Sequence, residues 1–339
     1  MSMRIARMTR VEIPGMGGTT AVRRSSFHTT NSPPAPSPLD NLQPNLLVGN
    51  RYELIEKLAK TRLSAIWKAH DQIEDRDVVV KFINDQELAS NENSILIEGY
   101  HEMFPERFDS GIHETMRYIV MEFIPGSRLR DLIESPLRIP LRQIIKIARD
   151  ILGGLKTLHK VAHKVHRDVK PENVLVRWSV LLNEWALMVK LIDFGIACAI
   201  GHKEEKATAL GSPAHMSPEQ AKAEPVHEYS DVYPVGLMLY EMITKNNPME
   251  TKDLLQTLYN QVHLALPPLP SGPIEERFDI GADGLREKVG SLHYQLKLMV
   301  AMLSEKDPQQ RLSDIDEIDF HLERLEQMAK ELEPYEHLA

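Results

Sequence analysis

The sequence predicts an α+β fold in which strands dominate up to about Ile124 and helices dominate after it. Residues Tyr52 to Ala69 alternate apolar and polar side chains, as half-buried strands do. Residues Leu141 to Val161 and Ile315 to Leu332 instead repeat their apolar side chains at helical spacing. A dense group of charged and amide side chains, His166 to Asn173, lies between these two regions of the chain.

Length and composition restrict the class of protein. A chain of 339 residues with 42% apolar residues can form one large domain or two lobes. A net charge of −9 argues against a nucleic-acid partner, because such partners select basic surfaces. The single cysteine, Cys198, excludes an internal disulfide framework and favours the reducing cytoplasm. No apolar run reaches the ~18–20 residues of a membrane span, so none is expected.

Residues 1–49 differ in composition from the remainder and are expected to form a disordered tail. They contain five arginines and two acidic residues, which gives this segment a charge of +3. The stretch from Ser25 to Pro38 is rich in Ser, Thr and Pro and has too few apolar side chains to order itself. A targeting segment and an autophosphorylated docking tail remain alternatives for this region.

The group at 166–173 carries the chemistry that organises the chain. It reads His-Arg-Asp-Val-Lys-Pro-Glu-Asn and is followed by the apolar run Val174 to Val176. A second apolar run, Leu191-Ile192, ends in Asp193, Phe194 and Gly195. Carboxylates and an amide at the ends of adjacent short strands can converge on Mg²⁺. Lys170 can neutralise a phosphoryl group during its transfer.

These two motifs resemble the catalytic-loop and D-F-G motifs of protein kinases. The stretch Gly211 to Gln220, Gly-Ser-Pro-Ala-His-Met-Ser-Pro-Glu-Gln, is similar to the end of the activation segment in bacterial Ser/Thr kinases of eukaryotic type (Hanks type). Arg311, in Asp-Pro-Gln-Gln-Arg, matches the arginine that pairs with the glutamate of that segment, here Glu219. The resemblance covers about residues 50–330.

The resemblance implies the bilobal protein-kinase fold, with a small β-rich N-lobe and a mostly helical C-lobe. The N-lobe and hinge are expected over residues 50–124, the C-lobe over 125–333 and a C-terminal tail over 334–339. The implied reaction is transfer of the γ-phosphoryl group of ATP to Ser or Thr hydroxyls of proteins, including the chain itself. ATP and Mg²⁺ are the implied cofactors, and no nucleic acid or membrane span is expected.

The resemblance also assigns catalytic roles. Asp168 accepts or orients the proton of the substrate hydroxyl, and Lys170 stabilises the transferring phosphoryl group. Asn173 and Asp193 hold Mg²⁺. Lys81, at the end of the strand-like run Val-Val-Val-Lys, grips the ATP phosphates. Such chemistry depends on positioning and on fixed charges.

Lys81 requires a carboxylate partner from the next helix, expected within residues 90–103. Glu98, which lies among Ile95, Leu96 and Ile97, is the expected partner. Glu92 and Glu87 are alternatives.

The phosphate loop departs from the kinase pattern. Its three glycine positions hold Ala59, Thr61 and Ser64, and Ile66 takes the place beneath adenine. Glycines let the backbone approach phosphate and adopt positive φ, so their loss predicts weaker ATP binding. A pseudokinase scaffold with weak nucleotide binding is therefore the alternative function.

Residues 118–126 resemble the last N-lobe strand and the hinge. Met121 is expected at the back of the nucleotide pocket, where it also packs in the core. The backbone groups of Glu122 and Ile124 are expected to pair with adenine.

The segment between Val176 and Val189 is longer than kinases usually have. It contains Trp178 and Trp185. It is predicted to be either a strand pair with its own apolar cluster or an exposed contact for a partner.

Three hydroxyl residues follow Gly195 in the activation segment. Ser217 is expected to be buried, and Ser212 is expected to bond the catalytic Asp168 and Lys170. Thr208 is therefore the expected phosphorylation site, where a phosphate would order the segment by pairing with Arg167.

Overall fold

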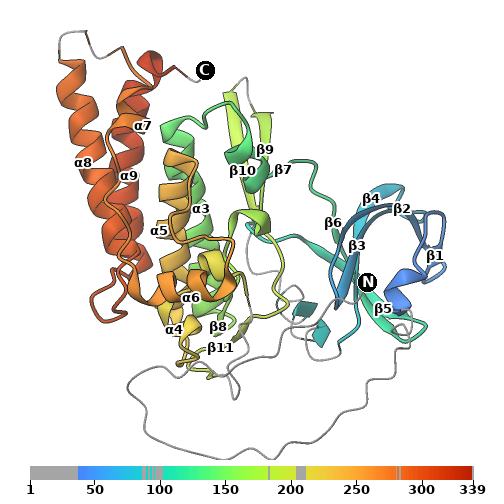
Figure 1. Ribbon diagram of the computed structural model, residues 1–339. Coiled ribbons are helices and arrows are strands. Elements are labelled where there is room, and N and C mark those ends of the chain that lie inside the picture. Colours follow the sequence, from blue (N-terminus) through green and yellow to red (C-terminus); the bar gives the residue numbers. More distant parts are fainter. Residues whose placement is uncertain are drawn as a thin grey trace, which may run out of the picture. The chain divides into compact units, whose positions relative to one another are not determined.

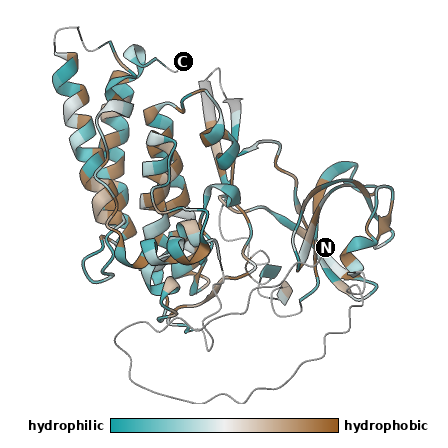
Figure 2. Ribbon diagram, viewed as in Figure 1, coloured by the Kyte–Doolittle hydropathy of each residue, from teal (hydrophilic) through white to brown (hydrophobic). Residues whose placement is uncertain are grey.

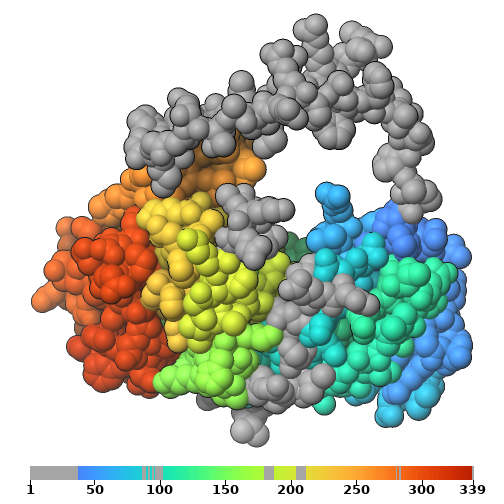
Figure 3. Space-filling model, turned by 90° about the horizontal axis from the view of Figure 1, so that it is seen from below, coloured from blue at the N-terminus to red at the C-terminus, as the bar shows by residue number. Residues whose placement is uncertain are grey.

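The computed structural model describes residues 37–85, 89–90, 92–93, 95, 102–181, 184–203, 211–279, 281 and 284–337. Residues Pro38–Ala339 form one compact unit, separate from residues Met1–Ser37. Within it, Figure 1 shows strands gathered at one end and helices at the other. The space-filling view shows the same division, with blue to teal atoms in one mass and green to red atoms in another (Figure 3). The expected α+β bilobal architecture is confirmed.

The N-lobe is an antiparallel sheet of six strands in the order β1-β2-β3-β4-β6-β5. Its strands are β1 (Leu47–Val48), β2 (Tyr52–Lys60), β3 (Ser64–Asp71), β4 (Arg76–Ile83), β5 (Arg107–His113) and β6 (Met116–Glu122). Alternate side chains of β3 are buried, as period-two patterning predicts. The register pairs Lys81 of β4 with Ile66 of β3 and with Ile119 of β6, so Lys81 lies on a central strand.

The N-lobe begins before the expected boundary at residue 49. Leu39, in the short helix η1 (Pro38–Asp40), and Leu42 are buried in the core of the sheet beside Tyr52 and Trp67. The Asp40 carboxylate pairs with Lys60 at the end of β2. Residues 38–49 of the expected tail therefore belong to the N-lobe, because Leu39 and Leu42 anchor this polar stretch in the core of the sheet. Residues 1–36 lie outside the described part of the chain.

The C-lobe is built around three long helices and the buried helix α5. Its helices are α2 (Leu129–Glu134), α3 (Leu141–Lys160), α4 (Pro218–Ala221), α5 (Glu228–Thr244), α6 (Leu254–His263), α7 (Gly272–Glu275), α8 (Leu285–Leu303) and α9 (Ile315–Leu332). Hydrophobic and hydrophilic residues share most of these helices (Figure 2), since helices such as α3 and α9 bury one side. In α5, by contrast, every residue from Ser230 to Ile243 is buried. The predicted helices at 141–161 and 315–332 are confirmed.

The extended segment after the catalytic group is an antiparallel hairpin. Strands β9 (Val174–Leu181) and β10 (Glu184–Leu191) pair along their length, and β7 (Ser127–Arg128) pairs with the start of β9. The predicted strand pair is thus confirmed, but Val176, Leu187 and Val189 belong to the main apolar core rather than to a separate cluster. A two-stranded ribbon, β8 (Lys164–Val165) with β11 (Cys198–Ala199), lies beside the catalytic group.

The expected C-terminal tail is attached to the C-lobe. Glu336 forms a buried ion pair of 2.9 Å with Arg277, and its carboxylate also accepts the N–H of Leu141 at the start of α3. The chain is therefore fixed as far as His337, whose N–H bonds the carbonyl of Arg277. In the described residues no helix combines the length and apolar character needed to cross a membrane.

Candidate active site

The catalytic loop, residues 166–173, converges on the carboxylate of Asp168. Lys170 Nζ lies 2.7 Å from Asp168 Oδ2, and Asn173 Nδ2 donates to the same oxygen at 3.0 Å. The N–H of Ser212 donates to Asp168 Oδ1 at 3.0 Å, and Lys170 Nζ also donates to Ser212 Oγ at 2.5 Å. The predicted positioning role of Ser212 agrees with this geometry. One carboxylate is thus fixed by a cation, an amide and a backbone N–H.

Asp231 of α5 holds the catalytic loop from beneath. Its two buried oxygens accept the N–H groups of His166 at 2.7 Å and Arg167 at 2.8 Å. His159 Nε2 lies 2.8 Å from the same carboxylate. Arg167 adopts φ of +70°, a strained conformation for a non-glycine residue that these bonds stabilise. The loop is therefore preorganised by a helix 65 residues away in sequence.

Lys81 is the centre of a buried charge triad. Its Nζ lies 2.7 Å from Glu92 Oε2 and 2.7 Å from Asp193 Oδ1. The structure pairs Lys81 with Glu92, which the sequence offered as an alternative to Glu98 and which lies among the helical residues around Ala89 and Ile95. Glu98 lies outside the described residues. Spacing alone could not choose among several carboxylates of one amphipathic helix.

Electrostatics favours the charged forms of Lys81 and Asp193, whereas burial raises the pKa of Glu92. Burial alone would lower the pKa of Lys81, but the charges of Glu92 and Asp193 raise it above its ordinary value. Burial would raise the pKa of Asp193, but the charge and hydrogen bond of Lys81 hold it at about 2. Asp193 is therefore ionised at neutral pH and available to a cation.

Phe194 fixes the direction of Asp193. Its ring is 1% exposed and packs edge-on against Phe104 at 4.9 Å between centroids and against His166 at 5.0 Å. With the phenylalanine buried in the C-lobe core, the neighbouring aspartate faces Lys81. The segment Asp193 to Gly195 is thus oriented so that its carboxylate faces the cavity that Lys81 also lines.

A cavity of about 310 Å³ lies between the lobes at this triad. It is lined by Leu58, Ile66, Val79, Lys81, Glu92, Met121, Glu122, Ile124, Leu175 and Asp193, among others. The expected pocket residues Ile66, Met121, Glu122 and Ile124 are thus brought together with Lys81. Met121 is 7% exposed and belongs to the main apolar cluster, so its predicted packing in the core is confirmed, and it also lines the cavity.

The phosphate hairpin, residues 59–64, does not line the cavity described here. Ala59 ends strand β2 with Lys60, and Ser64 begins β3. Thr61 Oγ1 accepts the N–H of Leu63 at 3.2 Å and of Ser64 at 3.0 Å. The Thr61 hydroxyl therefore occupies two backbone N–H groups of the turn, at a position where kinases usually have glycine.

The residues expected to hold Mg²⁺ are adjacent. The N–H of Ile192 donates to the carbonyl of Asn173 at 2.8 Å, which places Asp193 beside Asn173. Asn173 uses its amide nitrogen on Asp168, which leaves a carbonyl oxygen as the kind of hard ligand that Mg²⁺ takes. Among the described residues no cluster of three His, Cys, Asp or Glu could hold a metal alone. The donor set therefore fits a Mg²⁺ ion that completes its shell with phosphate and water oxygens.

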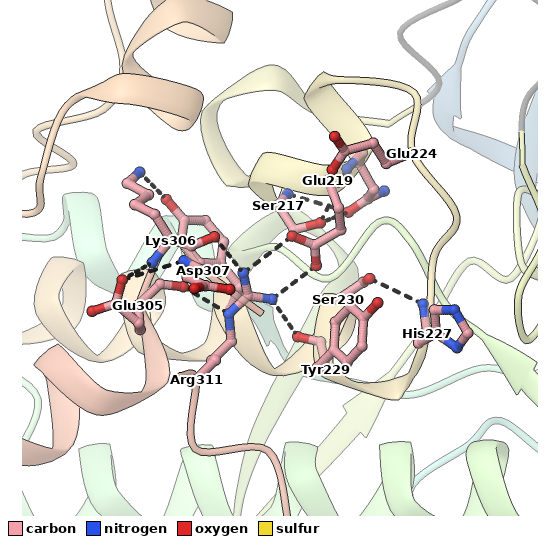
Figure 4. Close-up of polar contacts among 12 residues, drawn as sticks. Ser217, Glu219, Glu224, His227, Tyr229, Ser230, Glu305, Lys306, Asp307 and Arg311 are labelled. Carbon is pink, nitrogen blue, oxygen red and sulfur yellow. Dashed lines mark hydrogen bonds and ion pairs between the residues drawn. The ribbon is translucent and has the colours of Figure 1, made fainter. Parts of the chain in front are cut away.

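A buried bidentate ion pair anchors the activation segment. Arg311 donates to both carboxylate oxygens of Glu219 at 2.8 and 3.1 Å, and to the carbonyl of Tyr229 (Figure 4). Ser217 is fully buried and caps α4 by accepting the N–H of Gln220. The predicted pairing of Glu219 with Arg311 and the predicted burial of Ser217 are confirmed.

Two charged side chains near the cavity were not singled out from the sequence. Lys190 of β10 donates to Glu122 Oε2 at 2.8 Å and to the carbonyl of Phe104 at 3.0 Å, which holds the hinge glutamate. Arg130 of α2 bridges Glu172 and Glu241 at 2.7 and 2.6 Å. Both contacts join segments distant in sequence, so no local pattern indicates them.

Besides Glu98, a further predicted residue lies outside the described part of the chain. Thr208, the expected phosphorylation site, falls in residues 204–210. The side chains of residues 179–186, which include Trp185, are likewise not described, whereas Trp178 is 39% exposed.

Comparison with known proteins agrees with this geometry. The chain matches the protein kinase domain family over residues 52–322. It is 28% identical over 289 residues to the serine/threonine-protein kinase PknA of Corynebacterium glutamicum, covering 80% of this chain and 55% of that protein. It is 30% identical over 256 residues to PknB of Mycobacterium leprae, covering 70% and 39%, and 32% identical over 225 residues to serine/threonine-protein kinase A of Synechocystis, covering 60% and 42%. The chain spans about a third to a half of the length of the relatives it matches. With a kinase domain over most of its length and a Lys81–Glu92–Asp193 triad facing the catalytic loop, this chain belongs to the protein kinase family.

Proposed function

We propose that this chain is a serine/threonine protein kinase that transfers the γ-phosphoryl group of ATP to protein hydroxyls and to itself. The proposal rests on two groups of charged side chains, one around Asp168 and one around Lys81. Asp168 is bonded by Lys170, Asn173 and Ser212 on the C-lobe side, and Lys81 joins Glu92 to Asp193 across the cavity. Positioned charges of this kind are what phosphoryl transfer requires.

The proposed steps use groups that are already in place. The substrate hydroxyl oxygen attacks the γ-phosphorus, the bond to the β–γ bridging oxygen breaks, and ADP leaves. Asp168 receives the hydroxyl proton, and Lys170 offsets the negative charge of the transferring group. Lys81 holds the phosphates of ATP, and Asn173 and Asp193 are the proposed Mg²⁺ ligands. When bound, Mg²⁺ would neutralise phosphate charge and orient the leaving group.

The adenine ring is proposed to occupy the cavity between Ile66 and Leu175, with the backbone of Glu122 and Ile124 as its polar partners. Apolar side chains line this cavity beside the hinge. Proteins with exposed Ser or Thr are the proposed substrates. The reducing cytoplasm, where ATP is supplied, is the proposed site of action, in keeping with the single cysteine.

The experiment is a radiolabelled-ATP assay with Mg²⁺ on wild type and Asp168→Asn, with an added protein substrate. Wild type should label itself and the substrate, and Asp168→Asn should label neither while its circular dichroism is unchanged. Labelling that is equal in the two proteins would overturn the role of Asp168. No labelling by wild type, with ATP still bound in calorimetry, would establish the pseudokinase alternative instead.

A further inference from the structure

A short turn of the activation segment lies directly beside the catalytic aspartate. It consists of residues 212–215, here called the 212–215 turn, and it includes the short helix η3 (Pro213–His215). The N–H of Ser212 donates to Asp168 at 3.0 Å, and Lys170 donates to the Ser212 hydroxyl at 2.5 Å. A polypeptide whose hydroxyl reaches Asp168 therefore has to pass close to this turn, because proton transfer requires hydrogen-bond distance.

The middle of the 212–215 turn is held by a single buried side chain, Gln261 of α6, the helix next to α4 (Figure 1). Gln261 is fully buried, and its Nε2 donates to the carbonyl oxygen of Pro213 at 2.9 Å and to that of Ala214 at 2.7 Å. Asn247 Nδ2 donates to the Ala214 oxygen as well, at 3.0 Å. Because the two carbonyls belong to consecutive residues, one amide group fixes the position of this backbone relative to α6.

Two further side chains determine which way the Gln261 amide points. The hydroxyl of Tyr233, in α5, donates to Gln261 Oε1 at 2.7 Å. Lys306 Nζ donates to the Tyr233 oxygen at 2.5 Å and to the backbone carbonyl of Gln261 at 2.9 Å. An ammonium group can only donate, so the tyrosine oxygen accepts from Lys306 and gives its own proton to Gln261. The amide oxygen therefore faces Tyr233, and the N–H₂ group faces the turn.

The same helix carries a second buried amide that does not reach the turn. Asn260 is 7% exposed, and its Nδ2 donates to the carbonyl of Met249 at 3.1 Å. Its Oδ1 accepts from Gln256 at 2.9 Å. The two neighbouring amides of α6 thus have separate contacts: Asn260 joins the helix to the segment before it, whereas Gln261 joins the helix to the turn beside the active site.

We propose, on the basis of the kinase function proposed above, that Gln261 is a positioning residue for the protein substrate. Lys306 and Tyr233 orient its amide, and the amide fixes the backbone of the 212–215 turn. The turn then holds the substrate chain where its hydroxyl meets Asp168. Gln261 does not line the nucleotide cavity, so the binding of ATP should not depend on it.

The test compares three single variants with wild type. Gln261→Met keeps the length of the side chain but removes its donor and its acceptor. Tyr233→Phe keeps the ring but removes the hydroxyl that orients the amide. Asn260→Leu is the matched control, because it removes the neighbouring buried amide without touching the turn. Each protein is assayed with the serine peptide that wild type phosphorylates fastest in a random array, and ATP hydrolysis is measured without peptide.

Gln261→Met should raise the KM for the peptide about tenfold and leave the KM for ATP unchanged, because the turn loses two hydrogen bonds. Tyr233→Phe should raise the peptide KM about threefold, since the amide is then free to rotate. Hydrolysis of ATP by water needs no aligned polypeptide and should change by less than about twofold in both variants. Asn260→Leu should lower the melting temperature but leave both KM values unchanged.

Each other result has a definite meaning. Equal peptide KM values for wild type and Gln261→Met would overturn the positioning role alone. A parallel loss of peptide phosphorylation and ATP hydrolysis in Gln261→Met, shared by Asn260→Leu, would assign Gln261 a purely structural role. If wild type phosphorylates neither a peptide nor itself, the proposed kinase function fails and the positioning role fails with it.

Discussion

The catalytic loop and the phosphate hairpin face the same reaction but are held in different ways. His166, Arg167 and Asn173 of the loop are buried, and Asp231 bonds the loop from 65 residues away. The hairpin around Thr61 is exposed, and the bonds of the Thr61 hydroxyl span at most three residues. Two contacts from farther along the chain also hold it: Lys60 pairs with Asp40, and the carbonyl of Leu63 accepts the N–H of Asn84. Proton transfer requires a carboxylate that is fixed in place, whereas phosphate can be bound by the backbone N–H groups of a turn whose sequence varies. Loss of glycines in the hairpin is therefore more easily tolerated than any change in the loop.

The largest effect, on the rate of autophosphorylation, should come from breaking the buried charge triad of Lys81, Glu92 and Asp193. Lys81→Met or Asp193→Ala removes a charge that positions phosphate or Mg²⁺, so autophosphorylation should fall by at least about 10³-fold. Radiolabelled ATP measures the rate, and circular dichroism checks the fold. Lys297→Met, an exposed lysine of α8, should retain full activity. If Lys81→Met labels as well as wild type, the assigned role of the triad is wrong.

Removing the support beneath the catalytic loop should mainly affect stability. In Asp231→Asn the side chain keeps one acceptor oxygen, and its N–H₂ group faces the N–H of either His166 or Arg167, which leaves that buried donor unpaired. Breaking such a buried charged contact costs about 3–5 kcal/mol in the free energy of unfolding. Guanidinium denaturation measures it, with Glu287→Gln on the exposed face of α8 as control. A loss below about 1 kcal/mol would show that the loop does not depend on Asp231.

A smaller effect, on the affinity for ATP, is expected from substitutions in the hairpin of residues 59–64. Thr61→Val removes the hydroxyl that occupies the N–H groups of Leu63 and Ser64, so those donors become available to phosphate. Because one such bond contributes about 1 kcal/mol, ATP binding should tighten about fivefold. Glycine at residues 59, 61 and 64 together should tighten it further by restoring backbone freedom. Calorimetry measures both variants, and unchanged affinity would show that the hairpin does not limit binding.

Sequence patterns predicted the regions where chemistry or periodicity is local. The catalytic loop was predicted from eight consecutive residues, 166–173. Helix α9 begins at Ile315 and ends at Leu332, as its apolar spacing predicts. The choice of Glu92 over Glu98 depended on how one helix is oriented against Lys81. The apolar run Ile95 to Ile97 has Glu92 before it and Glu98 directly after it, so the sequence alone does not distinguish the two glutamates.

Other features depended on contacts between distant segments. Leu39 joins the N-lobe core only because the sheet leaves room for it, and Glu336 is fixed by Arg277, 59 residues earlier. Each lies in a stretch whose composition resembles a tail. Burial of Leu39 holds one segment, and the buried ion pair of Glu336 holds the other. A composition averaged over many residues does not reveal such single contacts.

The smallest expected effect concerns substrate choice beside the hinge. In kinases that favour basic residues before the target, an acidic residue is usual where this chain has Arg128. Arg130 also bridges Glu172 and Glu241, which neutralises two nearby carboxylates. Wild type should therefore show no preference for arginine upstream of the phosphorylated residue in a peptide array.

Arg128→Glu should raise the relative rate for such peptides about threefold at low salt, since an exposed charge pair contributes at most about 1 kcal/mol. The gain should shrink in high salt because the pair is exposed to solvent. Arg117→Glu, on the exposed face of β6, should leave the profile unchanged. A wild-type profile dominated by upstream arginine would refute the assignment.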